Sequence, residues 1–111
     1  MSNLKNRVQL IGNVGNDPEV QNLESGSKLV RLSLATNESY TNKEGERVTK
    51  TEWHTVVAWN KTAEKIESYV TKGREIGVDG KLTTRSWEDK DGIKRYITEV
   101  VCNEVLLLGG K

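Results

Sequence analysis

The chain has 111 residues, and its 17 basic and 16 acidic side chains give a formal net charge of +1. A chain of this length buries one hydrophobic core on folding, which excludes a large multidomain enzyme and predicts a single domain over residues 1–111. Its 27 Val, Thr and Ile residues far outnumber its 3 Ala residues, a bias that favours strands over helices and predicts a mostly-β protein.

The sequence contains a single cysteine, Cys102, and a single histidine, His54. One cysteine cannot form an internal disulfide, and one Cys with one His cannot build a structural zinc site, so we expect no metal and no cofactor. The longest apolar runs have four residues, whereas a membrane-spanning helix needs about 20. The N-terminal residues also lack the apolar core of a secretory signal. These features predict a cytoplasmic protein without a membrane partner.

The N-terminal part of the chain predicts two strands. Apolar and polar residues alternate over 4–14, and Gly12 within this stretch predicts a bulge or bend. Residues 15–18 are turn formers. The same alternation over 28–38 predicts the second strand.

The middle of the chain predicts a hairpin tip, a third strand and a helix. Residues 39–50 are polar with turn chemistry at 42–45, and they lead into a strand over 48–60. Apolar residues then recur at spacings of three and four over 62–72, which predicts a helix, and Gly73 supplies a residue suited to end it.

The C-terminal part predicts the fourth strand over 74–82 and the fifth over 95–108, joined by the polar segment 83–94 with a hairpin turn at Asp91-Gly92. Five strands with one helix between the third and fourth are the element order of an OB-fold. This fold is an all-β, five-stranded Greek-key barrel whose strands and loops bind oligonucleotides or oligosaccharides.

The six aromatic residues are all Trp or Tyr, and four of them are placed for binding. Trp53 and Trp59 fall on one side of the third predicted strand, whereas Tyr40 and Trp87 are surrounded by polar residues of predicted loops. A ring in such surroundings can stack on any unpaired base, because every base has a π-face. Basic residues follow the same segments, where phosphates need neutralisation. The pattern favours a single-stranded nucleic acid as partner; the alternative for each ring alone is packing in a core or within its own loop.

Five segments of the chain resemble the bacterial single-stranded DNA-binding proteins and together span nearly its whole length. They are Asn13–Val20, Leu34–Ser39, Thr51–His54, Tyr69–Gly73 and Tyr96–Val101. The resemblance implies an OB-fold domain that assembles as a homotetramer. It also implies sequence-independent binding of single-stranded DNA, which protects the strand during replication, recombination and repair.

The resemblance further implies which residues meet DNA. The base-stacking positions of the family are held here by Tyr40, Trp53, Trp59 and Trp87. Positions that commonly carry basic side chains near the DNA are held by Lys43, Lys61, Lys72 and Arg85. By contrast, Thr55, Thr83 and Ser86 stand where well-known members have Arg or Lys. We therefore expect fewer phosphate contacts and a shallower salt dependence of binding.

His54 has no acid, base or nucleophile at a spacing that indicates catalysis, so we expect no catalytic residue. In the family the matching histidine lies at the subunit interface. We expect the same role here, together with Asn6, Val8 and Leu10 of the first strand. Cys102 lies among β-branched residues and is interpreted as a small core residue.

The sequence stops near the point where the binding domain of the family ends. Members usually continue into a flexible segment with an acidic end that recruits replication and repair enzymes, and that C-terminal tail is absent here. We expect such enzyme partners only if a longer native protein carries the tail. The expected location is the bacterial cytoplasm, in association with the nucleoid.

Three alternatives stay open on the residues alone. An OB-fold primosome-type or RNA-binding protein would carry the same surface chemistry, and equal affinity for RNA and DNA strands would favour it. A small hydrolase or nuclease is disfavoured, because no Gly-rich phosphate loop, metal-ligand cluster or nucleophile–base pair is present. A structural interaction domain would use the aromatic residues as a protein interface, and DNA would then leave its tryptophan fluorescence unchanged.

Overall fold

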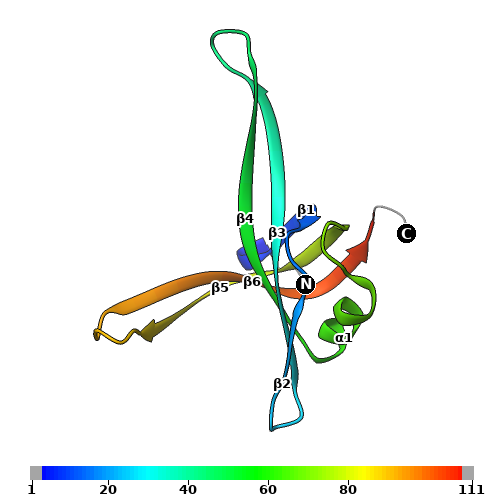
Figure 1. Ribbon diagram of the computed structural model, residues 1–111, viewed down its shortest axis with the longest axis vertical. Coiled ribbons are helices and arrows are strands. Elements are labelled where there is room, and N and C mark those ends of the chain that lie inside the picture. Colours follow the sequence, from blue (N-terminus) through cyan, green and yellow to red (C-terminus); the bar gives the residue numbers. More distant parts are fainter. Residues whose placement is uncertain (1–3, 109–111) are drawn as a thin grey trace.

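Five strands close into a barrel in the computed structural model, which describes residues 4–108 (Figure 1). The elements in chain order are a short 3-10 helix η1 (Leu4–Asn6), β1 (Val8–Val14), β2 (Glu19–Asn22), β3 (Lys28–Thr41), β4 (Arg47–Trp59), α1 (Asn60–Tyr69), β5 (Glu75–Glu88) and β6 (Lys94–Leu107).

The barrel follows the order β1-β5-β6-β4-β3, and β3 pairs back with β1 to close it. Strands β4 and β6 run parallel, and the other barrel pairs are antiparallel. This topology, with α1 between the third and fourth barrel strands, confirms the predicted OB-fold. Strand β2 was missed by the sequence analysis. It lies outside the barrel, pairs only with β3, and exposes all its residues, so its sequence carries no apolar alternation.

Two glycines allow the backbones of the barrel to approach closely. A β-carbon on Gly12 would lie 2.2 Å from the carbonyl oxygen of Ala35, at the point where β1 leaves β5 and meets β3. A β-carbon on Gly80 would lie 2.0 Å from the carbonyl oxygen of Val101. The ladder between β5 and β6 shifts register next to Gly80. At Gly12, where the sequence predicts a bulge or bend, the structure shows a close approach of two backbones. The register shift lies elsewhere, in the pairing of β5 with β6.

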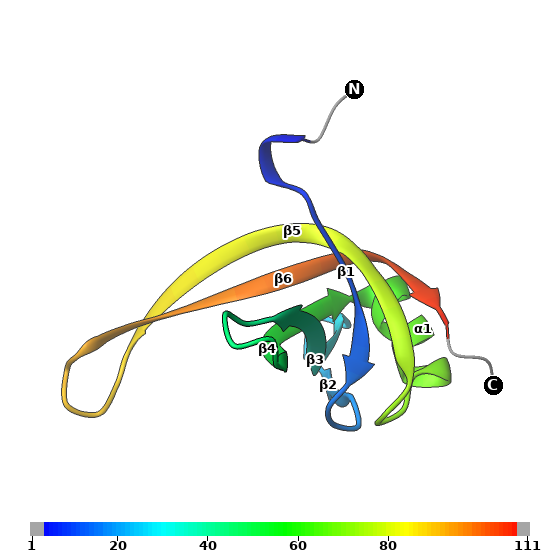
Figure 2. The ribbon, with the colours of Figure 1, turned by 90° about the horizontal axis from the view of Figure 1, so that it is seen from above.

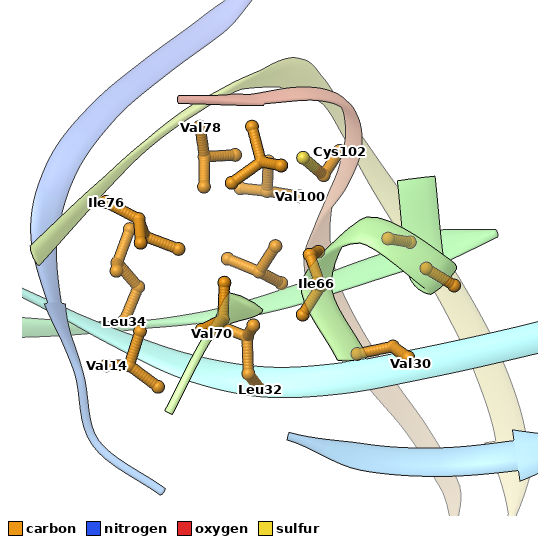
Figure 3. Packing of buried hydrophobic residues seen from close by; sticks show 14 residues of the cluster. Val14, Val30, Leu32, Leu34, Ile66, Val70, Ile76, Val78, Val100 and Cys102 are labelled. Carbon is orange, nitrogen blue, oxygen red and sulfur yellow. The ribbon is translucent and has the colours of Figure 1, made fainter. Parts of the chain in front are cut away.

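The core fills the inside of the barrel with aliphatic side chains from every barrel strand and from α1 (Figure 3). Leu32, Leu34, Ile66 and Ile76 are among its largest fully buried residues. Cys102 is also buried among them, as predicted, and burial raises the pKa of its thiol to about 11.

The helix α1 packs against β3, β4 and β6 and buries Ala63 and Ile66. It begins two residues earlier and ends three residues earlier than the predicted 62–72, because Val70 adopts an extended conformation that turns its side chain into the core. Gly73 does have a positive φ of 91°, but it lies in the loop after the helix rather than at its end.

Two hairpins extend beyond the barrel. Strands β3 and β4 remain paired out to Thr41 and Arg47, and β5 and β6 remain paired out to Glu88 and Lys94. The polar segments 39–50 and 83–94 are therefore mostly strand, because cross-strand backbone hydrogen bonds continue where no core face is needed. We call residues 36–52 the β3–β4 arm and residues 83–98 the β5–β6 arm. Figure 1 shows the two arms projecting in different directions, and Figure 2 shows the curvature of the β5–β6 arm.

Candidate nucleic-acid interface

The outward side of β4 carries two exposed tryptophans. Trp53 and Trp59 are 63% and 43% exposed, whereas Val56 and Ala58 on the other side of the strand are buried in the core. Six residue steps separate the two tryptophans along the strand, which corresponds to about 20 Å. Because neither ring contributes to the barrel core, both are available to a ligand.

The Trp53 ring packs against the backbone of the loop after β1. A β-carbon on Gly15 would lie 2.4 Å from Cζ3 and 3.0 Å from Cη2 of the indole, so the ring lies directly against this glycine. Gly15 is itself held to β3, because its N–H donates to the carbonyl oxygen of Ser33 at 2.8 Å. The loop thus limits how Trp53 can turn while leaving most of the ring accessible.

Strand pairing places charged residues on the same side of the sheet as these rings. Arg31 of β3 lies opposite Val57 of β4, and Val57 lies opposite Val101 of β6. Side chains of paired residues point to the same side, and so do side chains two positions along a strand. We call this side the aromatic face. It is formed by Trp53 and Trp59 of β4, Arg31 of β3, Glu99 of β6, and Arg85 and Trp87 of β5.

Glu99 is the one charged residue among the described residues that is buried, at 4% exposure. Arg85 donates to both of its carboxylate oxygens, from Nε at 3.1 Å and from an Nη at 3.4 Å. The Nε of Arg31 lies 3.8 Å from the same carboxylate. Two guanidinium groups thus share one carboxylate, and the cluster has a net charge of +1.

Of these three residues only Arg85 was predicted from the sequence; Arg31 and Glu99 were not. The alternation of Arg31 with Val30 and Leu32 does indicate an outward side chain on a buried strand. Nothing in the sequence indicates that residues 68 positions apart meet through strand pairing, and so the cluster could not be found there.

Trp87 lies on the β5–β6 arm, opposite Arg95. Its assignment to a polar loop was wrong, since β5 continues to Glu88. The adjacent turn is closed by Asp89, which accepts hydrogen bonds from the backbone N–H groups of Ile93 and Asp91 and from Nε of Arg95, each at 2.9 Å. The hydrogen bond from Ile93, followed by that from Arg95, holds the pKa of the Asp89 carboxyl below its ordinary value.

Tyr40 is also in a strand and not in a loop, near the end of the β3–β4 arm. The register pairs it with Val48 and gives it the orientation of Leu34, opposite to that of Trp53. Tyr40 is exposed because the arm has no core behind it. The structure therefore brings Trp53, Trp59 and Trp87 to one side of the sheet and leaves Tyr40 on the other side of its arm.

The three predicted lysines are exposed but lie on separate elements. Lys43 lies in the turn of the β3–β4 arm, Lys61 lies in the first turn of α1 close to Trp59, and Lys72 lies in the loop between α1 and β5. The backbone N–H of Lys72 donates to the Asp17 carboxylate at 3.0 Å, which ties this loop to the one after β1. Among the described residues, no hydrogen bond or ion pair joins the Lys72 side chain to the aromatic face.

The residues expected at a subunit interface have contacts within this chain. The Asn6 side chain donates to the carbonyl oxygen of Leu82 at 3.0 Å and accepts from its N–H at 2.9 Å. Val8 and Leu10 are partly buried against the core. Nε2 of His54, on the side of β4 opposite to Trp53, lies 2.9 Å from the Thr36 hydroxyl.

The exposed apolar residues on the β1 side of the barrel are not the residues that were predicted for the subunit interface. Ile11 of β1 and Leu106 of β6 are 62% and 61% exposed. Gly77 of β5 lies between them, since a β-carbon there would contact both side chains.

Within residues 4–108 the structure shows no group of three His, Cys, Asp or Glu side chains that could hold a metal ion. No helix in this part of the chain is long and apolar enough to cross a membrane.

Comparisons with known proteins point in one direction. The model of the single-strand binding protein family matches residues 5–108. The chain is 46% identical over 107 residues to single-stranded DNA-binding protein 1 of Chlorobaculum tepidum; the match covers 96% of this chain and 66% of that relative, so the chain spans about two thirds of the relative's length. A solved complex of the Plasmodium falciparum SSB with ssDNA is similar with a TM-score of 0.85 and 33% identity, covering 94% of this chain and 95% of that one.

Proposed function

The chain belongs to the single-strand binding protein family, and we propose that it binds single-stranded DNA, without sequence preference, on its aromatic face. The observation that carries the proposal is the pair of exposed tryptophans on the outward side of β4, neither of which has a part in the core. The similar Plasmodium falciparum structure is a complex with ssDNA, which supports the same ligand here.

Stacking of unpaired bases provides the recognition. Trp53, Trp59 and Trp87 offer their rings from one side of the sheet, and each stacked base contributes about 1–3 kcal/mol regardless of its identity. Tyr40 would receive a base on the other side of the β3–β4 arm, around which a flexible single strand can bend. A duplex cannot bind in this way, because its bases are already paired and stacked.

Exposed basic side chains neutralise the phosphates along the path of the DNA. We assign this role to Lys43, Lys61 and Lys72; Arg85 is also exposed, but it is already paired with Glu99. Affinity should then fall with salt, with a slope of about 0.7 per phosphate contact in a plot of log affinity against log salt concentration.

Binding protects the strand without any chemical step. A protein that binds only the unpaired state shifts the equilibrium away from hairpins and duplexes, and covers the strand against nucleases. This is a binding protein and not an enzyme, in keeping with its family, and it needs no cofactor. We propose that it acts in the cytoplasm at the nucleoid, during replication, recombination and repair. Recruitment of replication and repair enzymes is proposed only for a longer protein with an acidic C-terminal tail.

We also propose that the chain assembles as a homotetramer. Exposed Ile11 and Leu106 form an apolar strip on the β1 side of the barrel, separate from the aromatic face, and a second copy is the occupant that would leave the DNA-binding side free. His54 and Asn6 are the candidates for a second contact between copies of the chain.

The assembly proposal is tested by Ile11→Glu, which should reduce the mass measured by sedimentation equilibrium. An unchanged mass would contradict the assignment of the Ile11–Leu106 strip to a subunit contact.

The DNA-binding proposal is tested by tryptophan fluorescence during titration with an oligothymidine strand. A duplex and an oligouridine strand of equal length serve as comparison ligands, each at two salt concentrations. We expect strong quenching by the DNA strand, none by the duplex and weaker binding of the RNA strand. Equal affinity for the RNA strand would instead favour an RNA-binding protein, and no quenching by any ligand would overturn the stacking assignment.

A further inference from the structure

The Glu99 cluster on the aromatic face contains two arginines with different hydrogen bonding. Arg85 donates two hydrogen bonds to Glu99, at 3.1 and 3.4 Å. Arg31 approaches the same carboxylate only to 3.8 Å, which is beyond hydrogen-bonding distance. Among the residues that the structure describes, none accepts a hydrogen bond from the Arg31 guanidinium, so its donors are free for a ligand.

The buried carboxylate of Glu99 requires one of these arginines as a counterion. A carboxylate at 4% exposure is costly unless it is both paired and hydrogen bonded. The bidentate contact from Arg85 reaches both oxygens of Glu99 through its Nε–H and one Nη–H. Arg85 is therefore the counterion of Glu99, and the positive charge left over in the cluster belongs to Arg31.

The position of Arg31 relative to the rings is also suited to a phosphate. Along β3, Arg31 lies between the residues that pair with the two tryptophans. Trp59 pairs with Leu29, and Trp53 pairs with Ala35. If the bases of a DNA strand stack on both tryptophans, its sugar–phosphate backbone must pass the position of Arg31 between them. The side chain of Arg31 is 38% exposed there, so it is accessible from solvent.

We propose that Arg31 is a phosphate-binding residue of the aromatic face and that Arg85 chiefly neutralises Glu99. This inference rests on the proposed function, because it names a further contact of the same binding surface. The sequence alone predicted Arg85 as a phosphate contact and did not indicate Arg31. The inference makes Arg31 the main phosphate contact of this cluster instead.

The test compares salt dependence of oligothymidine binding for the wild-type protein and three variants that each remove one arginine. Arg31→Gln should lower the slope by about 0.7 and weaken binding about fivefold at 0.1 M salt, with little change in melting temperature. Arg85→Gln should lower the melting temperature and change the slope less than Arg31→Gln does. Arg7→Gln is the matched control, since Arg7 is also paired with a carboxylate, that of Asp79, but lies outside the aromatic face; its slope should equal that of the wild type.

A second measurement uses the wild-type protein and does not depend on the folding of any variant. In NMR spectra of the arginine Nε–H groups, oligothymidine should shift the Arg31 signal strongly and leave the Arg85 signal nearly unchanged. An unchanged slope for Arg31→Gln, or an Arg31 signal that does not respond while the strand is bound, would overturn the inference and leave the proposed function intact. If the wild-type protein itself fails to bind the strand, the proposed function fails and this inference fails with it.

Discussion

The Trp53 ring lies against Gly15, and a β-carbon at this glycine would be 2.4 Å from Cζ3 of the indole. The contact joins the loop after β1 to the outward side of β4, two segments that are 38 positions apart in the chain. A glycine in a turn thus determines the orientation of an exposed ring on another strand.

Gly15→Ala should weaken binding of single-stranded DNA, because the added methyl group would displace the Trp53 ring from its position. We expect a loss within the range of one base stack, about 1–3 kcal/mol. Fluorescence titration with oligothymidine measures it. A wild-type affinity for Gly15→Ala would show that Gly15 does not position the ring.

Trp87→Ala should weaken strand binding by about 1–3 kcal/mol and leave folding stability within about 0.5 kcal/mol of the wild type. The ring is exposed on the β5–β6 arm and has no part in the core. Binding is followed by quenching of the two remaining tryptophans, and stability by urea denaturation. A large drop in stability would mean that Trp87 supports the arm, and an unchanged affinity would remove it from the binding surface.

Asn60 should matter for the junction between Trp59 and α1. It has a positive φ of 54°, and its side-chain oxygen accepts a hydrogen bond from the N–H of Lys28 at 3.1 Å. Asn60→Ala should lower the free energy of unfolding by about 2–3 kcal/mol, since it loses the hydrogen bond and strains the left-handed backbone. Asn60→Gly keeps the backbone conformation available and should lose only about 1 kcal/mol. If urea denaturation finds the two variants equally destabilised, backbone strain is not part of the effect.

The turn of the β5–β6 arm should respond to acid through Asp89. Its carboxyl has a lowered pKa in the folded protein, because it accepts hydrogen bonds from Ile93, Arg95 and Asp91. The stabilising contribution is therefore fully present above 3.8, the ordinary pKa of the group, and is lost as the pH falls through the lowered folded value. The amide signal of Ile93, whose N–H donates to the Asp89 carboxylate, should stay constant from pH 7 down to about 4 and shift only in stronger acid.

Asp89→Asn is the matched variant for this titration, because it keeps an acceptor oxygen but has no proton to gain. Its Ile93 amide signal should not show this transition. A midpoint above 3.8 in the wild-type protein would contradict the direction of the pKa shift.

Much of the fold could be predicted from the sequence. The alternation of apolar residues located each barrel strand, and their spacing located α1, because burial of one side imposes a period on the sequence. The OB-fold was predicted from the order of these elements. The arms could be predicted less well. The apolar alternation stops near Glu38 and Leu82, whereas the strands continue, because a hairpin with solvent on both sides has no apolar period to show where it ends.

The residue types of the binding surface could also be predicted from the sequence: rings in polar surroundings, basic residues nearby, and segments that match one family. Which of these residues lie together depends on the three-dimensional fold. Trp87 joins Trp53 and Trp59 on one side of the sheet, whereas Tyr40 faces the other way, and Arg31 meets Glu99 and Arg85 across three strand pairings. The physical reason is that strand register pairs residues far apart in the chain, and neither composition nor periodicity specifies which strands become neighbours.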